Sequence, residues 1–296
     1  MRDSEHSPQS DSRSATSRMS KPLIDFDEVV RTRAPRLPRF VKSWLRRIVH
    51  VDEMNAYYDS HQGSYDFDFA RTFLEEGLHC SASAEGVENI PTTGNPLLFV
   101  SNHPLGGLDG IILSLVLGER RNYHIRLIVT DFLMLIRPLA GIFVPVNKIG
   151  KQSREYAIKQ RELWESDMDV LTFPAGACSR LQWIKGKGFE IRDLEWKNSF
   201  IRHAVKTQRD VVPVYFEGRN SRFFYLLAFC RKLIGIKANI EMLYLVDEMF
   251  GAKNKHFHVK IGRPIAYTTF DGSRSPDEWA SWVKEQVYQL RSMQQK

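Results

Sequence analysis

The sequence has few cysteines and no long uninterrupted hydrophobic run. Its 296 residues include 3 cysteines, Cys80, Cys178 and Cys230. They are too few and too far apart for a disulfide framework or a CxxC metal clamp, so we expect a reducing compartment. The most apolar stretches, 96–117 and 125–146, are interrupted by charged or amide side chains, which disfavours a membrane span. We therefore expect an intracellular protein that is soluble or peripherally attached to a membrane.

The first part of the chain is also poor in large apolar residues. Residues 1–20 are rich in Ser, Arg, Asp and Gln, which is typical of a disordered tail and lacks the apolar core of a secretory signal. We expect three parts, namely a disordered tail over 1–20, a helical and membrane-contacting segment over 21–77, and a larger domain over 78–296.

Acidic residues are outnumbered by basic ones, and the formal net charge is +7 at pH 7. A positive excess favours an anionic partner, such as membrane headgroups, an acidic carrier protein or nucleic acid. We expect no nucleic-acid partner, because the basic residues are dispersed and no helix-turn-helix, RRM or zinc-finger spacing accompanies them.

Residues 37–50 combine apolar and basic side chains at helical spacing. The apolar positions Val41, Trp44, Leu45 and Ile48 follow an i, i+3, i+4, i+7 pattern, and the cations around them are Arg39, Lys42, Arg46 and Arg47. This pattern predicts a basic amphipathic helix, which suits an anionic membrane surface. It equally suits a helix that packs on its own domain with a solvated basic face.

From residue 78 onward, short apolar segments alternate with helical patterns. Strands are expected at 97–100, 126–130, 142–146, 169–173, 211–216 and 256–261, and helices at 65–76, 109–117, 151–165, 198–207 and 222–233. Ser275 and Glu278 form a capping box before a last amphipathic helix. The alternation predicts an α/β fold with a mostly parallel central sheet flanked by helices.

A polar motif follows the strand expected at 97–100. It places His103 six positions before Asp109, and Gly106 and Gly107 lie between them. The end of a buried strand is where α/β proteins place reactive groups, and such a pair can act as general base and orienting carboxylate. The two glycines permit a tight turn or a close approach of substrate. The alternatives are a hydrogen-bonded core histidine and an aspartate that only caps a helix.

Two later segments carry cations next to strand ends. Residues 173–180 form a small, kinked loop that ends in Arg180, which is able to bind a phosphate or carboxylate or to remain solvated. Pro213 interrupts the strand at 211–216, which indicates an edge or bulge near a site. Arg219 follows it and is a second candidate anion ligand.

The motifs resemble, in order, the four blocks of the lysophospholipid (glycerolipid) acyltransferase family. The blocks are Asn-His…Asp at 102–109, Gly-Ile-Phe-Val-Pro-Val at 141–146, Phe-Pro-x-Gly at 173–176 and Val-Pro-Val at 212–214. The first and fourth blocks look like those of a bacterial hemolysin-like branch, which includes enzymes that O-acylate lyso-ornithine and lyso-glycine lipids. The resemblance spans roughly 80–265 and implies an acyltransferase domain over 78–296.

The resemblance also implies roles for single residues. His103 would deprotonate an acceptor hydroxyl, Asp109 would orient it, and the alkoxide would attack an acyl thioester. The residues expected around the substrate are Asn102, Gly106, Gly107, Gly141, Phe143, Phe173, Pro174, Gly176, Arg180, Pro213 and Arg219.

The chain departs from the family pattern in its three first blocks. The aspartate usually follows the histidine by five positions, whereas here the spacing is six. Asn147 replaces the usual second-block arginine, and Ala175 and Cys178 replace the third-block glutamate and arginine. The family uses these cations to hold a phosphate. We therefore expect a lyso-aminolipid acceptor, such as lyso-ornithine or lyso-glycine lipid. The alternative is a 1-acylglycerol-3-phosphate acyltransferase of phospholipid synthesis.

The resemblance implies a peripheral enzyme on the cytoplasmic face of the inner membrane. We expect it to use acyl-ACP or acyl-CoA as donor and no metal or bound cofactor. His256 and His258 share a strand face but have no third ligand in sequence, so zinc is not expected there. The sequence leaves the oligomeric state, the donor and the acyl chain length open.

Overall fold

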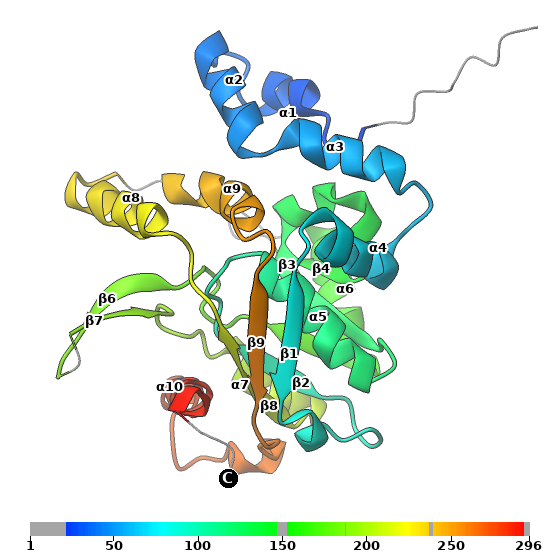
Figure 1. Cartoon of the computed structure of the whole chain (residues 1–296). Helices are drawn as coiled ribbons and strands as arrows, with labels where there is room; N and C mark the ends of the chain where they lie inside the picture. Colours follow the sequence, from blue (N-terminus) through cyan, green and yellow to red (C-terminus); the bar gives the residue numbers. More distant parts are fainter. Residues whose placement is uncertain (1–21, 147–152, 187, 237–238, 293–296) are drawn as a thin grey trace, which may run out of the picture.

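The computed structural model describes residues 22–146, 153–186, 188–236 and 239–292. The expected tail at 1–20 lies outside the described residues. A seven-stranded sheet forms the centre (Figure 1). Its spatial order is β1 (Ser81–Glu85), β9 (His256–Ile261), β8 (Val211–Glu217), β2 (Leu98–Ser101), β5 (Asp169–Thr172), β3 (Ile125–Thr130) and β4 (Phe143–Val146).

The five strands from β8 to β4 are parallel, whereas β9 runs antiparallel to β8 and pairs in parallel with β1. The expected α/β fold with a mostly parallel sheet is therefore confirmed. All six strands predicted from sequence are present, and their ends differ by at most one residue from the expected ones. The central parallel strands β2, β5 and β8 were predictable because they are covered on both faces and form nearly continuous apolar runs.

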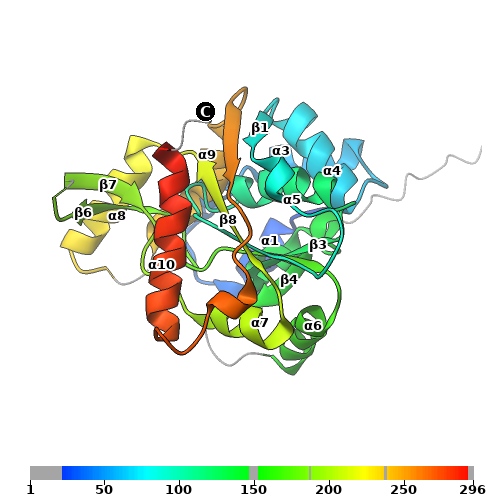
Figure 2. The same cartoon turned by 90° about the horizontal axis from the view of Figure 1, so that it is seen from below.

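Helices cover both faces of the sheet (Figures 1 and 2). The longer ones that follow the strands are α5 (Leu108–Arg120), α6 (Arg154–Glu165), α7 (Ser199–Thr207), α8 (Arg222–Leu233), α9 (Leu245–Phe250) and α10 (Pro276–Gln289). The expected capping box at the start of α10 is present, since Ser275 and Glu278 bind each other's backbone N–H reciprocally.

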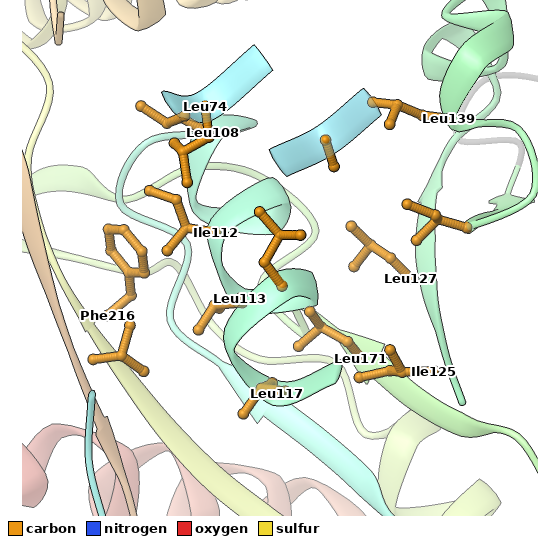
Figure 3. Close-up of a cluster of buried hydrophobic side chains, with 14 of the residues drawn as sticks. Leu74, Leu108, Ile112, Leu113, Leu117, Ile125, Leu127, Leu139, Leu171 and Phe216 are labelled. Carbon is orange, nitrogen blue, oxygen red and sulfur yellow. The ribbon is translucent and has the colours of Figure 1, made fainter. Parts of the chain in front are cut away.

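The alternation of side chains along β2 divides the core into two layers. Phe99 points into the layer under α5, and Leu98 and Val100 point into the layer under α7 and α10. Figure 3 shows the first layer, in which residues of α5 lie among residues of the strands, namely Ile112, Leu113, Leu117, Leu127, Leu171 and Phe216. Truncating one of these leucines to alanine costs about 2–5 kcal/mol of stability. The strand ends that carry the site are thus fixed from both sides.

The N-terminal segment consists of α1 (Phe26–Arg33), α2 (Arg39–Ile48), α3 (Val51–Ser60) and α4 (Asp66–Thr72), which continues as a π-helical turn over Phe73–Gly77. The amphipathic pattern at 37–50 corresponds to α2. Part of its apolar face packs on the protein, because Ile48 is buried and the Trp44 ring lies 5.7 Å from that of Tyr244. Phe40 is 75% exposed. None of the helices in the described part of the chain is long and apolar enough to cross a bilayer.

Several elements were not expected from sequence. Besides β1 and α9, the chain forms a separate antiparallel hairpin of β6 (Arg180–Ile184) and β7 (Gly188–Arg192). Short 3₁₀ turns lie at Val87–Asn89, Asp131–Leu135, Arg137–Leu139, Ile240–Tyr244, Tyr267–Thr269 and Leu290–Ser292. The hairpin projects away from the sheet beside α8 (Figure 1). The hairpin was not among the expected strands, although its alternating apolar residues carry the strand signal.

Candidate functional site

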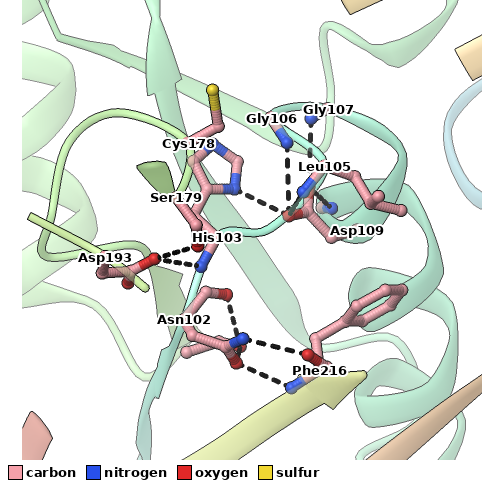
Figure 4. A network of polar contacts seen from close by, with 12 residues as sticks. Asn102, His103, Leu105, Gly106, Gly107, Asp109, Cys178, Ser179, Asp193 and Phe216 are labelled. Atoms are coloured by element: carbon pink, nitrogen blue, oxygen red, sulfur yellow. Dashed lines mark hydrogen bonds and ion pairs between the residues drawn. The ribbon is translucent and has the colours of Figure 1, made fainter. Parts of the chain in front are cut away.

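The histidine and aspartate of the first motif lie next to each other. His103 follows β2, Asp109 lies in the first turn of α5, and the imidazole Nδ1 is 2.9 Å from the Asp109 Oδ2 (Figure 4). The Asp109 side chain is fully buried and that of His103 is 16% exposed. One ring thus reaches the surface while its partner is held inside the protein.

The loop that precedes α5 is built around the Asp109 carboxylate. The carboxylate accepts N–H bonds from Leu105 at 2.9 Å, Gly107 at 3.0 Å and Gly110 at 3.0 Å, and a longer one from Gly106 at 3.4 Å. The N-cap of α5 is Gly107, so the expectation that Asp109 caps the helix is wrong by position. Asp109 lies in the first turn, where its carboxylate binds nearby N–H groups and also contacts the histidine.

These contacts decide the charge of Asp109. Burial raises the pKa of the carboxyl group, but the charge and hydrogen bond of His103, together with the N–H groups of Leu105 and Gly106, outweigh burial and lower its pKa overall. The carboxylate is therefore ionised at neutral pH. It accepts the Nδ1 proton of His103 and leaves Nε2 as the basic nitrogen.

The imidazole ring of His103 also packs against an aromatic ring. Its ring stacks on Phe173 at a centroid distance of 3.9 Å, and no described residue hydrogen-bonds its Nε2. Phe173 follows β5, the strand adjacent to β2, so the two aromatic rings leave neighbouring strand ends. Parallel strands place their carboxyl ends at one sheet edge, which brings the first and third motifs together as expected.

Of the two motif glycines, only Gly106 has a backbone conformation that favours glycine. Gly106 has φ +78°, and a Cβ there would lie 2.8 Å from Leu245 and 3.2 Å from Cys178. Gly107 is extended, with φ −176°, and a Cβ there would meet no atom within 4 Å. The first glycine makes the turn, whereas the second borders open space.

Asp193 is a member of the site that sequence reasoning missed. Its carboxylate accepts a hydrogen bond from the Ser179 hydroxyl at 2.6 Å, from the His103 N–H at 3.1 Å and from the Trp196 indole at 2.9 Å. The Ser179 N–H in turn donates to the His103 carbonyl at 2.8 Å. Burial raises the pKa of Asp193, and these donors only partly offset it. Asp193 thus joins the end of the hairpin to the histidine loop. The two residues are 90 positions apart in sequence, so no local pattern reveals the contact.

Cys178 lies against the histidine loop but is unsuited to nucleophilic chemistry. Its side chain is buried, and burial raises the pKa of the thiol to about 11 in spite of the nearby Arg180 guanidinium. The thiol therefore stays protonated at neutral pH, whereas a nucleophilic cysteine needs its thiolate form.

The third-motif loop closes on itself beside the histidine. Gly176 has φ +65° and donates its N–H to the Phe173 carbonyl at 2.9 Å. The Pro174 carbonyl accepts the Lys197 N–H at 3.1 Å. These contacts hold the loop that carries Phe173, whose ring stacks on His103. Pro174 and Gly176 belong to the same loop.

Arg180 does not have the expected role of an anion ligand in this structure. Its guanidinium lies 2.9 Å from the carboxylate of Glu241, which is fully buried and also pairs with Arg231 at 2.8 Å. It further packs over the Phe224 ring at 5.3 Å. Since a buried carboxylate needs both cations, Arg180 is occupied with holding η5 (Ile240–Tyr244) and α8 to the hairpin.

Two other expected ligands are structural. The Asn102 amide exchanges two hydrogen bonds with the Phe216 backbone, at 2.9 and 2.7 Å, and is almost completely buried. Pro213 lies within β8 opposite Val100 and packs against Gly262. Both residues hold strands together. The prediction that they contact substrate is not supported by their positions.

Gly141 and Phe143 are also placed away from His103. Gly141 precedes β4 and donates its N–H to Asp66 at 2.9 Å. Phe143 begins β4 and pairs in register with Leu127 of β3. Both lie toward the amino end of a parallel strand, whereas His103 follows a carboxyl end, so the structure does not bring them together. Asn147, which stands at the position of the second-block arginine, lies outside the described residues.

A cleft of about 710 Å³ opens beside the histidine loop. Leu105 of that loop lines it, together with Arg219 and Arg222 after β8. Arg219 is exposed, and its guanidinium is therefore accessible to a ligand with a carboxylate or another anionic group.

His256 and His258 belong to a polar row between β1 and β9. His256 bonds to Ser81 and Ser83, at 2.8 Å each, and His258 bonds to Glu85 at 2.7 Å. In the part of the chain that the structure describes, no group of three or more His, Cys, Asp or Glu side chains is arranged to hold a metal ion.

Comparisons with known proteins agree on one family. The profile described as Acyltransferase matches residues 26–295. A lyso-glycine lipid O-acyltransferase from Phocaeicola vulgatus is 44% identical over 272 residues, which cover 90% of this chain and 95% of that protein. A protein of the same name from Bacteroides thetaiotaomicron is 46% identical over 272 residues, covering 90% and 97% of the two chains.

Among solved structures, the chain is similar to the 1-acyl-sn-glycerophosphate (LPA) acyltransferase PlsC from Thermotoga maritima. That match has 19% identity and a TM-score of 0.42, and it covers 93% of this chain and 92% of the other. The family profile spans most of the sequence, and the relatives share more than two fifths of its residues over nearly their whole length. The chain belongs to the acyltransferase family.

Proposed function

We propose that this protein transfers a fatty acyl group from a thioester to the hydroxyl of a lyso-aminolipid, such as lyso-glycine lipid. The observation that carries the proposal is the His103–Asp109 pair, in which a buried carboxylate engages Nδ1 and leaves Nε2 without a partner among the described residues. The two relatives named lyso-glycine lipid O-acyltransferase support this acceptor.

The reaction uses His103 as both base and acid. Its Nε2 takes the proton from the acceptor hydroxyl while the oxygen attacks the thioester carbonyl carbon. The C–O bond forms, the C–S bond breaks, and the leaving thiolate takes the proton back from the imidazolium. Asp109 stabilises the imidazolium between these steps because it stays ionised beside Nδ1.

The site favours direct transfer over an acyl-enzyme intermediate. Cys178 is buried and protonated, and the Ser179 hydroxyl donates to Asp193. The Ser101 hydroxyl donates to the Asn102 carbonyl at 2.9 Å. None of these three groups is paired with the His103 ring as a nucleophile would be.

The positions of the cations favour a carboxylate over a phosphate on the acceptor. Arg180, the nearest third-motif cation, is bound to Glu241. The remaining described cations at the cleft are Arg219, Arg222 and Lys255, and a single arginine is sufficient to bind a carboxylate through two N–H groups. A lysophosphatidate acyltransferase is the competing function.

The net charge of +7 suits both an acidic acyl carrier protein and an anionic membrane. We place the protein at the cytoplasmic face of the inner membrane, with acyl-ACP or acyl-CoA as donor. The reaction needs no metal or bound cofactor, because a base, an orienting carboxylate and a reactive thioester complete it.

To test the proposal, the purified protein is incubated with one acyl thioester and equal amounts of lyso-glycine lipid, lyso-ornithine lipid and lysophosphatidate. Mass spectrometry of the products then gives relative rates. We expect an aminolipid to be acylated at least ~10-fold faster than lysophosphatidate, because a site built for one headgroup leaves groups unpaired with another. Equal or faster acylation of lysophosphatidate contradicts the proposed acceptor.

A further inference from the structure

Helix α8 is apolar on both of its faces, which is unusual for a helix at the surface. Its inner face contributes Phe224, Tyr225 and Ala228, all buried. Its outer face and the residue that follows remain exposed, with Phe223 51%, Leu226 60%, Phe229 52%, Leu233 76% and Ile234 69% accessible. A helix that is hydrophobic all round is normally covered on all sides. The outer face of α8 therefore requires an apolar neighbour.

The tip of the β6–β7 hairpin extends this exposed surface. Trp183 is 67% and Phe189 65% exposed, and the two residues pair across the strands with ring centroids 5.0 Å apart. Ile191, further down the same hairpin, packs against Phe224 and its buried neighbours. The hairpin and α8 lie side by side in both views of the molecule (Figures 1 and 2).

Aromatic contacts join this surface to the N-terminal helices. The Phe223 ring lies 5.0 Å from that of Tyr244, and Tyr244 contacts Trp44 of α2. Arg180 of the hairpin packs over Phe224 of α8. The hairpin, α8 and α2 are therefore joined through these side-chain contacts.

The charged residues of α8 and of the hairpin tip are all basic. From residue 218 to residue 240 the sequence contains no Asp or Glu, and from 180 to 189 it contains none either. Cations lie at both ends of α8, at Arg222 and Lys232, and Lys185 lies at the hairpin tip. Exposed aromatic and aliphatic residues bordered by Lys and Arg are the composition of segments that lie in a membrane interface.

We infer that the outer face of α8 and the tip of the β6–β7 hairpin form a docking surface for an anionic lipid bilayer. The apolar side chains enter the boundary between headgroups and acyl chains, and the cations bind the lipid phosphates. The inference deepens the proposed function and rests on it for the identity of the acceptor. It places the main apolar contact on α8 and the hairpin, since α2 turns Ile48 and Trp44 partly toward the protein.

The surface adjoins the cleft that Leu105 of the histidine loop lines. Phe223, Tyr225 and Arg222 of α8 line the same cleft as Leu105 of the histidine loop. Ser179, whose N–H binds the His103 carbonyl, immediately precedes the first residue of β6. A lipid acceptor in the docked bilayer is therefore able to move its headgroup into the cleft while its acyl chain stays in the apolar layer.

Cys230 offers a native reporter for α8. Cys80 and Cys178 are buried and Cys230 is exposed, so a thiol-reactive, polarity-sensitive fluorophore labels α8 selectively. We expect a blue shift when vesicles of phosphatidylglycerol and phosphatidylethanolamine are added, and a smaller one with phosphatidylcholine alone. The control carries Cys230→Ser and Val205→Cys, which moves the label to α7, and its emission should not change.

The second measurement is vesicle sedimentation of variants. Leu226→Ser, Phe229→Ser and Leu233→Ser together should reduce vesicle affinity at least ~10-fold, because membrane affinity scales with buried apolar area. The matched control, Ile158→Ser with Val205→Ser, removes exposed apolar side chains from α6 and α7 and should leave vesicle affinity unchanged. Thermal unfolding checks that each variant is folded.

Three results overturn the inference. One is a labelled Cys230 that does not respond to vesicles, and another is a triple variant that binds vesicles as well as the parent protein. The third is a label that shifts only with acyl carrier protein, or with self-association in light scattering, since the surface then belongs to a protein partner. The same binding assays on His103→Ala separate the two proposals, because that variant should bind vesicles normally whether or not the acyltransfer proposal holds.

Discussion

The Nδ1 of His103 lies 2.9 Å from the Oδ2 of Asp109, although one more residue separates them than the related motif has. Gly106 turns the loop in a left-handed conformation, and the N–H groups of Leu105 and Gly107 on either side of it bind the carboxylate. A loop with a spacing of six positions thus still pairs the histidine with the aspartate, as the resemblance to the acyltransferase motif implies.

The buried Asp109 carboxylate should make stability depend on pH. Its pKa is lowered in the folded protein, while in the unfolded chain it is about 3.9. A lowered pKa stabilises the fold above the unfolded value, and this contribution is lost as the pH falls through the folded value. Urea unfolding between pH 3 and 7 measures it. Asp109→Asn should be less stable than the parent at pH 7, and the difference should shrink toward pH 3. A constant difference contradicts the ionised state of Asp109.

The two motif glycines should respond differently to alanine. Gly106→Ala places a side chain at φ +78° against Leu245 and Cys178, which should cost about 1–3 kcal/mol in the free energy of unfolding. Gly107→Ala adds a methyl group in open space and should change it by less than about 0.5 kcal/mol. Chemical denaturation of both variants checks this, and equal losses would show that the loop geometry is wrong.

Arginine substitutions should separate a structural cation from a ligand-binding one. Arg180→Ala leaves the buried Glu241 with one cation, and the loss of stability should be about 3 kcal/mol. Arg219→Ala should leave the melting temperature nearly unchanged and raise the KM for the aminolipid acceptor about 10-fold. Thermal unfolding and steady-state kinetics on both variants test the assignment. A rise in KM for Arg180→Ala but not for Arg219→Ala would show that Arg180 is the ligand-binding cation.

Cysteine substitution tests the absence of an acyl-enzyme. Burial raises the pKa of Cys178 to about 11, so its thiolate is scarce at neutral pH and Cys178→Ala should keep kcat within about 10-fold. Intact-protein mass spectrometry after brief mixing with donor alone should show no added acyl group. A stable acyl adduct that disappears in Cys178→Ala would replace direct transfer with a two-step route.

The strand, loop and helix around His103 were predictable from sequence because each has a strong local signal. The continuous apolar run of β2 marks a strand covered on both faces, and the apolar residues that follow Asp109 mark α5, which begins one residue earlier than expected. These two signals fix the ends of the loop, so the spacing between His103 and Asp109 was informative.

The partners of the cations and of Asp193 were not predictable in this way. Arg180 meets Glu241 across 61 residues, and Asp193 meets the His103 backbone across 90. Such contacts depend on how the hairpin and η5 fold over the sheet, and no local pattern encodes this. The hairpin itself was not predicted, although its alternating apolar residues pair across two strands.

The most direct test of the account compares the parent protein with His103→Ala in one assay. Both are incubated with lyso-glycine lipid and an acyl thioester, and the acylated lipid is quantified by mass spectrometry. Circular dichroism confirms that both are folded. We expect the variant to lose at least ~10²-fold in kcat, because no other described group is placed to take the acceptor proton. Acylation by folded His103→Ala at the parent rate would contradict the central claim.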